Sequence, residues 1–186
     1  MEQLLEWDQS LFLFINRLGN NEWDYYWKII TNKRTWTPLY LILVSHFFYK
    51  YSWKKALVLT LIAILGVGLS DQVTNLFKYG VARLRPCHQD LLIESMRMVK
   101  KSCGGKFGFY SAHASNHMFL AVYLSLIIRE RWVSTSLVIW ALFIGYSRIY
   151  LGVHFPSDVF VGFIMGSFWA ALMYKLYTFY LNKLTL

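Results

Sequence analysis

The segment SRIYLGVHFPSD, residues 147–158, places ionisable side chains between two strongly apolar stretches of the chain. Because an ionisable group close to lipid is costly, such residues usually face a cavity and mark a functional site. Asp158 follows His154 by four residues, and Pro156 between them favours a helix that starts there and carries Asp158 in its first turn. A carboxylate that holds one imidazole nitrogen leaves the other free to act as a nucleophile. The spacing therefore predicts a nucleophilic His154 oriented by Asp158.

Three cations near the ends of apolar stretches indicate what this nucleophile attacks. Lys78, Arg85 and Arg148 complement a phosphate dianion, and an arginine can bind two of its oxygens at once. Lys78 and Arg85 are seven residues apart, so a helix that continued past its apolar stretch would place both on one face. Cations beside a nucleophilic imidazole are typical of phosphoryl transfer.

Ser111, Ala112 and His113 precede another apolar stretch and are predicted to open a helix. The free N–H groups and the dipole at a helix N-terminus favour an anion, so Ser111 and the amides of 111–113 are predicted phosphate ligands. His113 is the predicted acid that protonates the leaving oxygen. A nucleophile, an orienting carboxylate, an acid and a cradle of cations make a phosphoryl-transfer site without a metal or another cofactor.

Further polar residues close to this set carry weaker signals. Asp71 and Asn75 share a helical face with Lys78. Asp71 is predicted simply to neutralise a cation there, and the alternative is that Asp71 and Asn75 support the residues that bind the phosphate. His113 and His117 have the i, i+4 spacing that can bind zinc. Because the glutamate of the H-E-x-x-H pattern is missing between them, no metal site is predicted.

Five apolar stretches are predicted to position these residues: 36–49, 56–69, 118–128, 132–146 and 159–174. With its flanks, each stretch approaches the roughly 20 residues that cross a bilayer as a helix. The short connections between several of them predict antiparallel neighbours in a bundle. Alternating directions bring the end of the second, the start of the third, the end of the fourth and the start of the fifth to one membrane face. All the candidate site residues lie at these ends.

The first 31 residues have a different pattern. Apolar positions between Leu4 and Leu18 are interrupted by acidic and polar residues, and the chain then breaks at GNN and continues as a Trp/Tyr-rich turn, EWDYYWKII. This pattern predicts amphipathic helices in the membrane interface, with a sixth span as the alternative. The predicted fold is all-α, an integral membrane helical bundle in a single domain, 1–186, with interfacial helices in 1–31, transmembrane helices in 35–181 and a polar catalytic-face loop in 79–110.

The composition agrees with a membrane protein. Hydrophobic residues make up 56% of the chain and charged residues only 16%, well below the roughly 25% of soluble domains. The net charge of +9 comes from basic residues between apolar stretches, which fits lipid headgroups or a phosphorylated substrate rather than nucleic acid. The acidic N-terminus lacks a cleavable signal pattern. Membrane lipids and a lipid phosphate are the predicted partners, and no particular oligomeric state is indicated.

Both cysteines of the chain, Cys87 and Cys103, fall in the same polar loop. Clustered cysteines form a disulfide when their loop faces an oxidising space, and a free pair is the alternative.

Three segments in order resemble the signature motifs of a known family. KYGVARLRP (78–86) fits K-x6-R-P, YSAH (110–113) is similar to P-S-G-H, and SRIYLGVHFPSD (147–158) fits S-R-x5-H-x3-D. The chain resembles the type 2 phosphatidic acid phosphatase superfamily, in its membrane-bound bacterial lipid phosphatase branch, over residues 70 to 165. The resemblance implies a six-helix-type bundle and no metal requirement.

The resemblance also assigns roles to individual residues. It implies a phosphohistidine intermediate on His154 with Asp158 as its partner, and His113 as the acid. It implies phosphate binding by the residues that match the cationic and serine positions: Lys78, Arg85, Ser111 and Arg148. The second motif departs from the family pattern, because Tyr110 replaces proline and Ala112 replaces glycine. The Ala112 amide still serves the site if its backbone does not need a positive φ.

These observations predict a metal-independent hydrolase that removes a terminal phosphate from a membrane lipid phosphate or diphosphate. Phosphatidylglycerol phosphate, undecaprenyl diphosphate, phosphatidic acid and lipid A 1-phosphate all fit a site at the membrane face. The alternative is a non-catalytic membrane protein that binds phosphorylated lipids, which the intact His113, His154 and Asp158 disfavour. A soluble vanadate-dependent haloperoxidase is disfavoured by the short chain with five apolar spans.

Two signals for the orientation of the site disagree. More basic residues lie on the catalytic side than on the other, so a positive-inside count would turn the site towards the cytoplasm. Three of those cations are needed for phosphate, however, and the loop with two cysteines favours an oxidising space. The predicted location is the bacterial inner membrane, with the site facing the periplasm.

Overall fold

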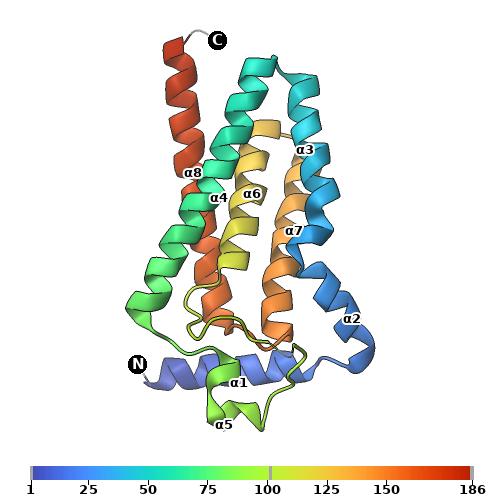
Figure 1. The fold of residues 1–186 in the computed structure, drawn as a ribbon, viewed down its shortest axis with the longest axis vertical. Helices are drawn as coiled ribbons and strands as arrows, with labels where there is room; N and C mark the ends of the chain where they lie inside the picture. The colour runs from blue at the N-terminus through green and yellow to red at the C-terminus, as the bar shows by residue number, and fades with distance from the viewer. Residues whose placement is uncertain (1, 101, 185–186) are drawn as a thin grey trace.

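The computed structural model describes residues 2–100 and 102–184, and these are helical except for turns and one loop (Figure 1). The predicted all-α class is confirmed. The elements in chain order are α1 (Glu2–Arg17), α2 (Asn21–Ile30), the 3-10 helix η1 (Lys33–Trp36), α3 (Thr37–Lys50), α4 (Trp53–Val81), the 3-10 helix η2 (Pro86–His88), α5 (Asp90–Ile93), α6 (Ala112–Ile128), α7 (Arg131–Tyr150) and α8 (Pro156–Leu184).

The bundle consists of long helices that run side by side, with α6 in contact with α4, α7 and α8 (Figure 1). Among the described residues, α4, α7 and α8 are long and apolar enough to cross a membrane. The expectation that all five stretches approach 20 residues was wrong for two of them, because α6 has 17 residues and α3 has 14. Helix α6 runs only from the serine cap at Ser111 to the left-handed Arg129, and the turn η1 takes up the residues before α3.

The N-terminal segment packs across one end of the bundle (Figure 1). Helix α1 buries Phe12 and Asn16 against the bundle. Its opposite side exposes apolar residues at alternating spacings of three and four, which makes the helix amphipathic: Leu4, Trp7, Leu11, Phe14 and Leu18. The predicted turn EWDYYWKII was wrong, since these residues belong to helix α2, where the Asn20 side chain accepts a hydrogen bond from Trp23 N.

Helices α6 and α8 approach each other closely because α8 carries two glycines one turn apart. A Cβ at Gly162 would come within 2.8 Å of the Ser111 carbonyl oxygen, and one at Gly166 would overlap the Ser115 carbonyl oxygen. Small residues at this spacing let membrane helices pack backbone to backbone. The contact places the start of α6 against the start of α8, where Ser111 N donates to the Asp158 carbonyl oxygen at 3.0 Å.

The turn from α7 to α8 is a Schellman motif centred on Gly152. Gly152 has φ +77°, Val153 N donates to Arg148 O at 3.1 Å and Gly152 N donates to Ile149 O at 3.0 Å. This pair of bonds ends a helix with a left-handed residue that favours glycine. The reversal carries His154 back over the end of α7, between Arg148 and the start of α8.

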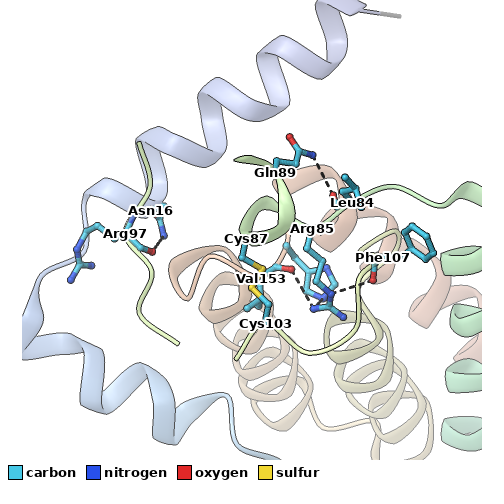
Figure 2. Close-up of a disulfide and its surroundings, with 10 residues drawn as sticks. Asn16, Leu84, Arg85, Cys87, Gln89, Arg97, Cys103, Phe107 and Val153 are labelled. Carbon is cyan, nitrogen blue, oxygen red and sulfur yellow. Dashed lines mark hydrogen bonds between the residues drawn. A yellow bond between two sulfur atoms is a disulfide. The ribbon is translucent and has the colours of Figure 1, made fainter. Parts of the chain in front are cut away.

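The segment between α4 and α6 folds over the end of the bundle that carries the candidate residues. Leu84 and Phe107 form an isolated antiparallel bridge, and Cys87 forms a disulfide with Cys103 (Figure 2). Their Cα atoms are 6.3 Å apart, within the range of protein disulfides. The disulfide, which the sequence left open against a free pair, is therefore present.

Asn16 of α1 ties this loop to the rest of the protein. Its side chain accepts from Arg97 N at 2.7 Å and donates to Arg97 O at 3.2 Å (Figure 2). It also donates to Tyr150 O at 2.9 Å. Because Asn16 is fully buried, these bonds satisfy polar groups that water does not reach.

Removal of the disulfide should loosen the loop without changing the bundle. Cys87 and Cys103 are 16 residues apart, and closing a loop of that size stabilises a fold by about 3 kcal/mol. We expect the double variant Cys87→Ser, Cys103→Ser to lose about this much free energy of unfolding, measured by denaturant titration in detergent micelles. A double variant as stable as the wild-type protein would contradict this.

Candidate active site

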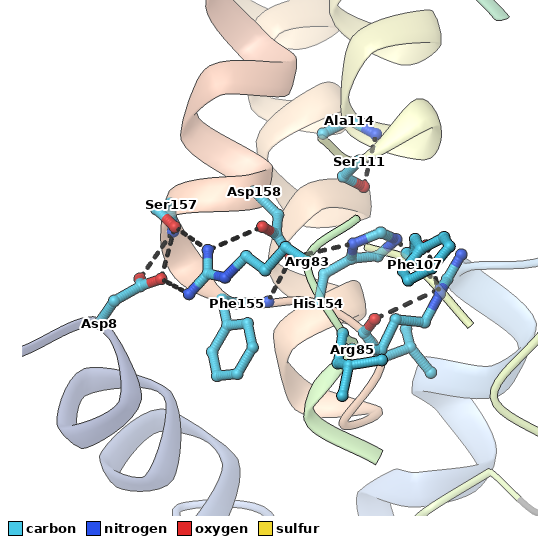
Figure 3. Close-up of polar contacts among 12 residues, drawn as sticks. Asp8, Arg83, Arg85, Phe107, Ser111, Ala114, His154, Phe155, Ser157 and Asp158 are labelled. Atoms are coloured by element: carbon cyan, nitrogen blue, oxygen red, sulfur yellow. Dashed lines mark hydrogen bonds and ion pairs between the residues drawn. The ribbon is translucent and has the colours of Figure 1, made fainter. Parts of the chain in front are cut away.

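His154 and Asp158 meet at the end of the bundle, as the sequence predicts (Figure 3). His154 Nδ1 lies 3.4 Å from Asp158 Oδ2. His154 is 2% exposed and Asp158 is fully buried. A carboxylate at Nδ1 favours the tautomer with a proton on that nitrogen, which leaves the lone pair on Nε2.

Arg85 faces that lone pair. Its Nη1 lies 3.3 Å from His154 Nε2 and donates to Val153 O at 3.3 Å, while its Nε donates to Phe107 O at 3.2 Å (Figure 3). The two carbonyl groups fix the guanidinium plane beside the imidazole. Nε2 therefore points to the place where a cation can hold an anionic group.

The helical face that was expected to join Lys78 and Arg85 does not exist. Helix α4 ends at Val81, and Ala82 adopts a left-handed conformation with φ 53°. Arg85 lies instead in an extended segment whose backbone N–H donates to Lys106 O at 3.2 Å. Lys78, in the last turn of α4, still interacts electrostatically with Arg85. The loop, not the helix, brings the two cations together.

Arg148 presents an unused donor at the same site. It is buried in the last turn of α7, and its Nη1 donates to Thr31 Oγ1 at 2.6 Å. Its Nε has no hydrogen-bond partner among the described residues. An unpaired buried donor is costly, and a bound phosphate oxygen would satisfy it.

Burial and the surrounding charges favour the neutral form of His154. Burial lowers the pKa of the His154 imidazole well below its usual value, and the nearby cations Arg85, Arg148 and Lys78 lower it further. A neutral imidazole is the form that attacks an electrophile. Lys100 adds to the positive charge around the site. Burial lowers the pKa of its ammonium group, and the nearby Arg148 and Arg85 lower it further. The sequence placed this lysine only within the polar loop 79–110.

The start of α6 has the predicted geometry. Ser111 is the buried N-cap, and its Oγ accepts from Ala114 N at 3.4 Å, which leaves the hydroxyl proton for another acceptor. The amides of Ala112 and His113 lie in the first turn, where a helix offers no internal acceptors. Ala112 is not among the described residues with positive φ. Replacement of the family's glycine therefore preserves the amide without strain.

Tyr110, the second departure from the family motif, is an internal packing residue. Its ring is fully buried and lies 5.4 Å from the ring of Phe77.

Asp71 and Asn75, the two further polar residues that the sequence analysis singled out on α4, differ in their contacts. Asp71 accepts from Asn116 Nδ2 at 3.5 Å and interacts electrostatically with Lys78. Asn75 is half-buried and makes no side-chain hydrogen bond among the described residues. The structure brings Asp71 but not Asn75 into the network around the cations.

His117 is engaged in packing beneath the site. Its Nδ1 lies 2.7 Å from the His113 carbonyl oxygen and its Nε2 lies 3.5 Å from the Tyr40 hydroxyl. The rings of His113 and His117 are nearly parallel, 6.2 Å apart. They stack rather than converge on a shared point, so the i, i+4 spacing serves packing.

A cavity of about 520 Å³ opens from the site into the bundle. It begins at Ala112 and His113 and extends along α6 to Leu124, about 18 Å at the rise of a helix. Lys33, Asp71 and Asn116 also contribute to its wall. The remaining lining is mostly apolar and aromatic and comes from α3, α4, α6 and α7: Tyr40, Leu43, Val44, Phe47, Thr60, Ala63, Ile64, Val67, His117, Leu120 and Trp140.

Three polar residues around Asp158 were missed by the sequence analysis. Arg83 Nη1 donates to Asp158 Oδ1 at 2.9 Å, and Arg83 Nη2 donates to Asp8 Oδ2 at 2.6 Å. Ser157 joins them by donating its N–H to Asp8 Oδ1 at 2.9 Å. The sequence offered two weak signals for them. Arg83 lies two residues before Arg85, and Asp8 interrupts the apolar pattern of α1.

The chain is similar to proteins of one known family. Residues 55–181 match the model of the PAP2 superfamily. The chain is 36% identical to a lipid A 4'-phosphatase of Bacteroides thetaiotaomicron over 100% of this chain and 81% of the relative, and 33% identical to one of Porphyromonas gingivalis over 96% and 76%. The transmembrane PAP2-type phosphatidylglycerolphosphate phosphatase of Bacillus subtilis has the same fold, with a TM-score of 0.74, 21% identity and coverage of 95% of this chain and 87% of that one. The chain therefore belongs to the PAP2 superfamily and is a multi-pass membrane lipid phosphatase.

Proposed function

We propose that this protein removes a phosphate monoester from a phosphorylated glycolipid of the lipid A type through a phosphohistidine on His154. The observation that carries the mechanism is the position of His154, with Nδ1 at Asp158 and Nε2 beside Arg85. A protein that only binds phosphate needs cations but no oriented nucleophile. The mechanism uses neither a metal nor another cofactor.

In the first half-reaction, the cations hold the phosphate and Nε2 of His154 attacks phosphorus. The bond between phosphorus and the lipid oxygen breaks, its electron pair stays on that oxygen, and His113 supplies the proton that makes it a hydroxyl. Asp158 accepts a hydrogen bond from Nδ1–H and offsets the positive charge that develops on the ring. The phosphate oxygens are held by Lys78, Arg85, Arg148, Ser111 and the amides of Ala112 and His113.

In the second half-reaction, water replaces the histidine. His113, now neutral, removes a proton from the water as its oxygen attacks phosphorus, and the bond between phosphorus and Nε2 breaks. The electron pair returns to Nε2 and inorganic phosphate leaves. His113 and His154 are then in their starting states.

The cavity and the relatives support the choice of substrate. The cavity starts beside His113 and continues between apolar side chains, which suits an acyl chain that stays in the bilayer while its phosphate reaches the cations. Lys33, Asp71 and Asn116 offer polar contacts to a headgroup near the site. Two similar proteins that cover nearly all of this chain are named lipid A 4'-phosphatases. This favours a phosphorylated sugar over phosphatidylglycerol phosphate, phosphatidic acid or undecaprenyl diphosphate.

We further infer that the protein lies in the bacterial inner membrane with the site on the periplasmic side. The disulfide Cys87–Cys103 belongs to the loop that covers the site. Disulfides persist in the periplasm and are rare in the cytosol. The disulfide is a better indicator of orientation than the positive-inside count, because several of the basic residues on that side surround the proposed phosphate site.

Phosphate release by purified protein tests the mechanism. With EDTA present, the wild-type protein should release phosphate from lipid A and more slowly from phosphatidylglycerol phosphate and phosphatidic acid. His154→Ala should lose at least about 1,000-fold in kcat, because loss of a catalytic nucleophile leaves only the residual effect of binding groups. Release that stops in EDTA, or that survives His154→Ala, would contradict the mechanism. Phosphate binding without turnover would favour the non-catalytic alternative.

The charge state of His154 provides a test by pH. The pKa of its imidazole is lowered from the usual 6.5 by burial and by Arg85, Arg148 and Lys78. The ring should therefore remain neutral as the pH falls through 6.5, and should take up a proton only at lower pH. We expect ¹⁵N NMR of the phosphate-free protein to show this, with the signal assigned by its loss in His154→Ala. A midpoint at or above 6.5 would contradict the cationic surroundings.

The orientation can be measured with single cysteines at opposite ends of the bundle. In the background Cys87→Ser, Cys103→Ser, the two positions to compare are Leu91→Cys, beside the site, and Tyr49→Cys, at the far end. Both side chains are more than nine-tenths exposed. A membrane-impermeant maleimide should label Leu91→Cys in spheroplasts and Tyr49→Cys only after lysis. The reverse pattern would place the site in the cytoplasm.

A further inference from the structure

Arg83 forms a bridge between Asp158 and the N-terminal helix α1 (Figure 3). One terminal nitrogen, Nη1, donates to Asp158 Oδ1 at 2.9 Å, and the other, Nη2, donates to Asp8 Oδ2 at 2.6 Å. The guanidinium carbon also lies 4.1 Å from the centre of the Phe155 ring. The two carboxylates and the ring restrict the guanidinium in three directions.

The same contacts start helix α8. Phe155 precedes Pro156, the first residue of α8, and its side chain cannot accept a hydrogen bond. Asp8 supplies the missing cap from α1, because its Oδ1 accepts from Ser157 N at 2.9 Å. Asp158 reaches back to accept from Phe155 N at 3.0 Å through Oδ2, the reciprocal bond of a capping box.

The two carboxylate oxygens of Asp158 thus have different partners. Oδ2 holds His154 Nδ1 and Phe155 N, and Oδ1 holds Arg83. No hydrogen bond or ion pair joins Arg83 to His154 among the described residues, and its guanidinium lies on the opposite side of the Asp158 carboxylate from the imidazole (Figure 3). The side chain of Arg83 is 15% exposed, that of Asp8 is 11% exposed and that of Asp158 is fully buried. Without Arg83, two carboxylates would face each other with little solvent and without the cation that bridges them, which is costly.

We propose that Arg83 is a positioning residue, which fixes the Asp158 carboxylate so that its Oδ2 orients His154, and that Asp8 anchors Arg83 in that position. This inference rests on the proposed phosphohistidine mechanism. Helix α1 is then part of the site, since it lies across the end of the bundle and supplies Asp8, which anchors Arg83. Phe12 of α1 adds to the anchor, with its ring 5.4 Å from that of Phe155.

The test compares kinetic constants of Arg83→Gln, Arg83→Lys and Asp8→Asn with those of the wild-type protein. A small displacement of a reacting group costs about 100-fold in rate, so Arg83→Gln should lower kcat by about that factor. KM and inhibition by inorganic phosphate should stay unchanged, because Arg83 does not face the phosphate. Arg83→Lys keeps the positive charge but loses the two terminal nitrogens that donate to separate carboxylates. Asp8→Asn keeps Arg83 but removes the carboxylate that anchors it. Both should give intermediate kcat values.

Arg17→Gln is the matched control. Arg17 is an exposed arginine that also joins α1 to the loop, since its Nε donates to Ser95 O at 2.8 Å, but it has no contact with Asp158. Its kcat should equal that of the wild-type protein. A kcat of Arg83→Gln equal to that of Arg17→Gln would overturn the proposal. A loss in phosphate binding instead of kcat would also overturn it, since Arg83 would then be a substrate ligand.

A second readout does not depend on turnover. In ¹⁵N NMR of the phosphate-free protein, the His154 tautomer with the proton on Nδ1 should dominate in the wild type and become mixed in Arg83→Gln. If Arg83→Gln does not fold, Asp8→Asn and Arg83→Lys decide by the same readout, and an unchanged tautomer in both would overturn the proposal. Failure of the proposed function is recognised separately, because the wild-type protein would then be inactive or His154→Ala would be active.

Discussion

A buried carboxylate, that of Asp158, is the interaction on which the rest of the site depends. A charge without solvent is tolerated only when hydrogen bonds and opposite charges surround it. Asp158 has Phe155 N and His154 Nδ1 at one oxygen and Arg83 at the other. Every one of these partners comes from the start of α8 or from a segment folded against it. The position of the imidazole follows from how this carboxylate is satisfied.

The scaffold brings the remaining parts to that carboxylate by backbone geometry. Gly162 and Gly166 let α6 approach α8 closely, so that the amides at the start of α6 lie near Asp158. Gly152 ends α7 with a left-handed turn and returns the chain to His154, while Arg148 stays in the last helical turn. The loop closed by the disulfide supplies Arg85. The proposed phosphate site is therefore assembled from helix ends and a loop rather than from one continuous segment.

The sequence predicted the helical bundle and the residues at its catalytic end, because apolar stretches and ionisable residues at their ends are local patterns. Contacts between distant segments were not visible in it. Lys78 and Arg85 were expected on one helix, but the left-handed Ala82 ends α4 between them. Arg83 and Asp8 carried only weak signals in the sequence, since their importance comes from pairing 75 residues apart in the chain. The lengths of α3 and α6 depended on caps and turns that apolar periodicity does not specify.

The most direct test of the account is to trap the phosphorylated enzyme. Wild-type protein mixed with lipid A labelled in its phosphate groups would be quenched with alkali within milliseconds to seconds, digested and mapped by mass spectrometry. The account predicts a base-stable, acid-labile phosphate on the peptide that contains His154, formed before free phosphate appears and absent in His154→Ala. Turnover without a phosphorylated peptide, or with the phosphate on another residue, would contradict the central claim that His154 is the nucleophile.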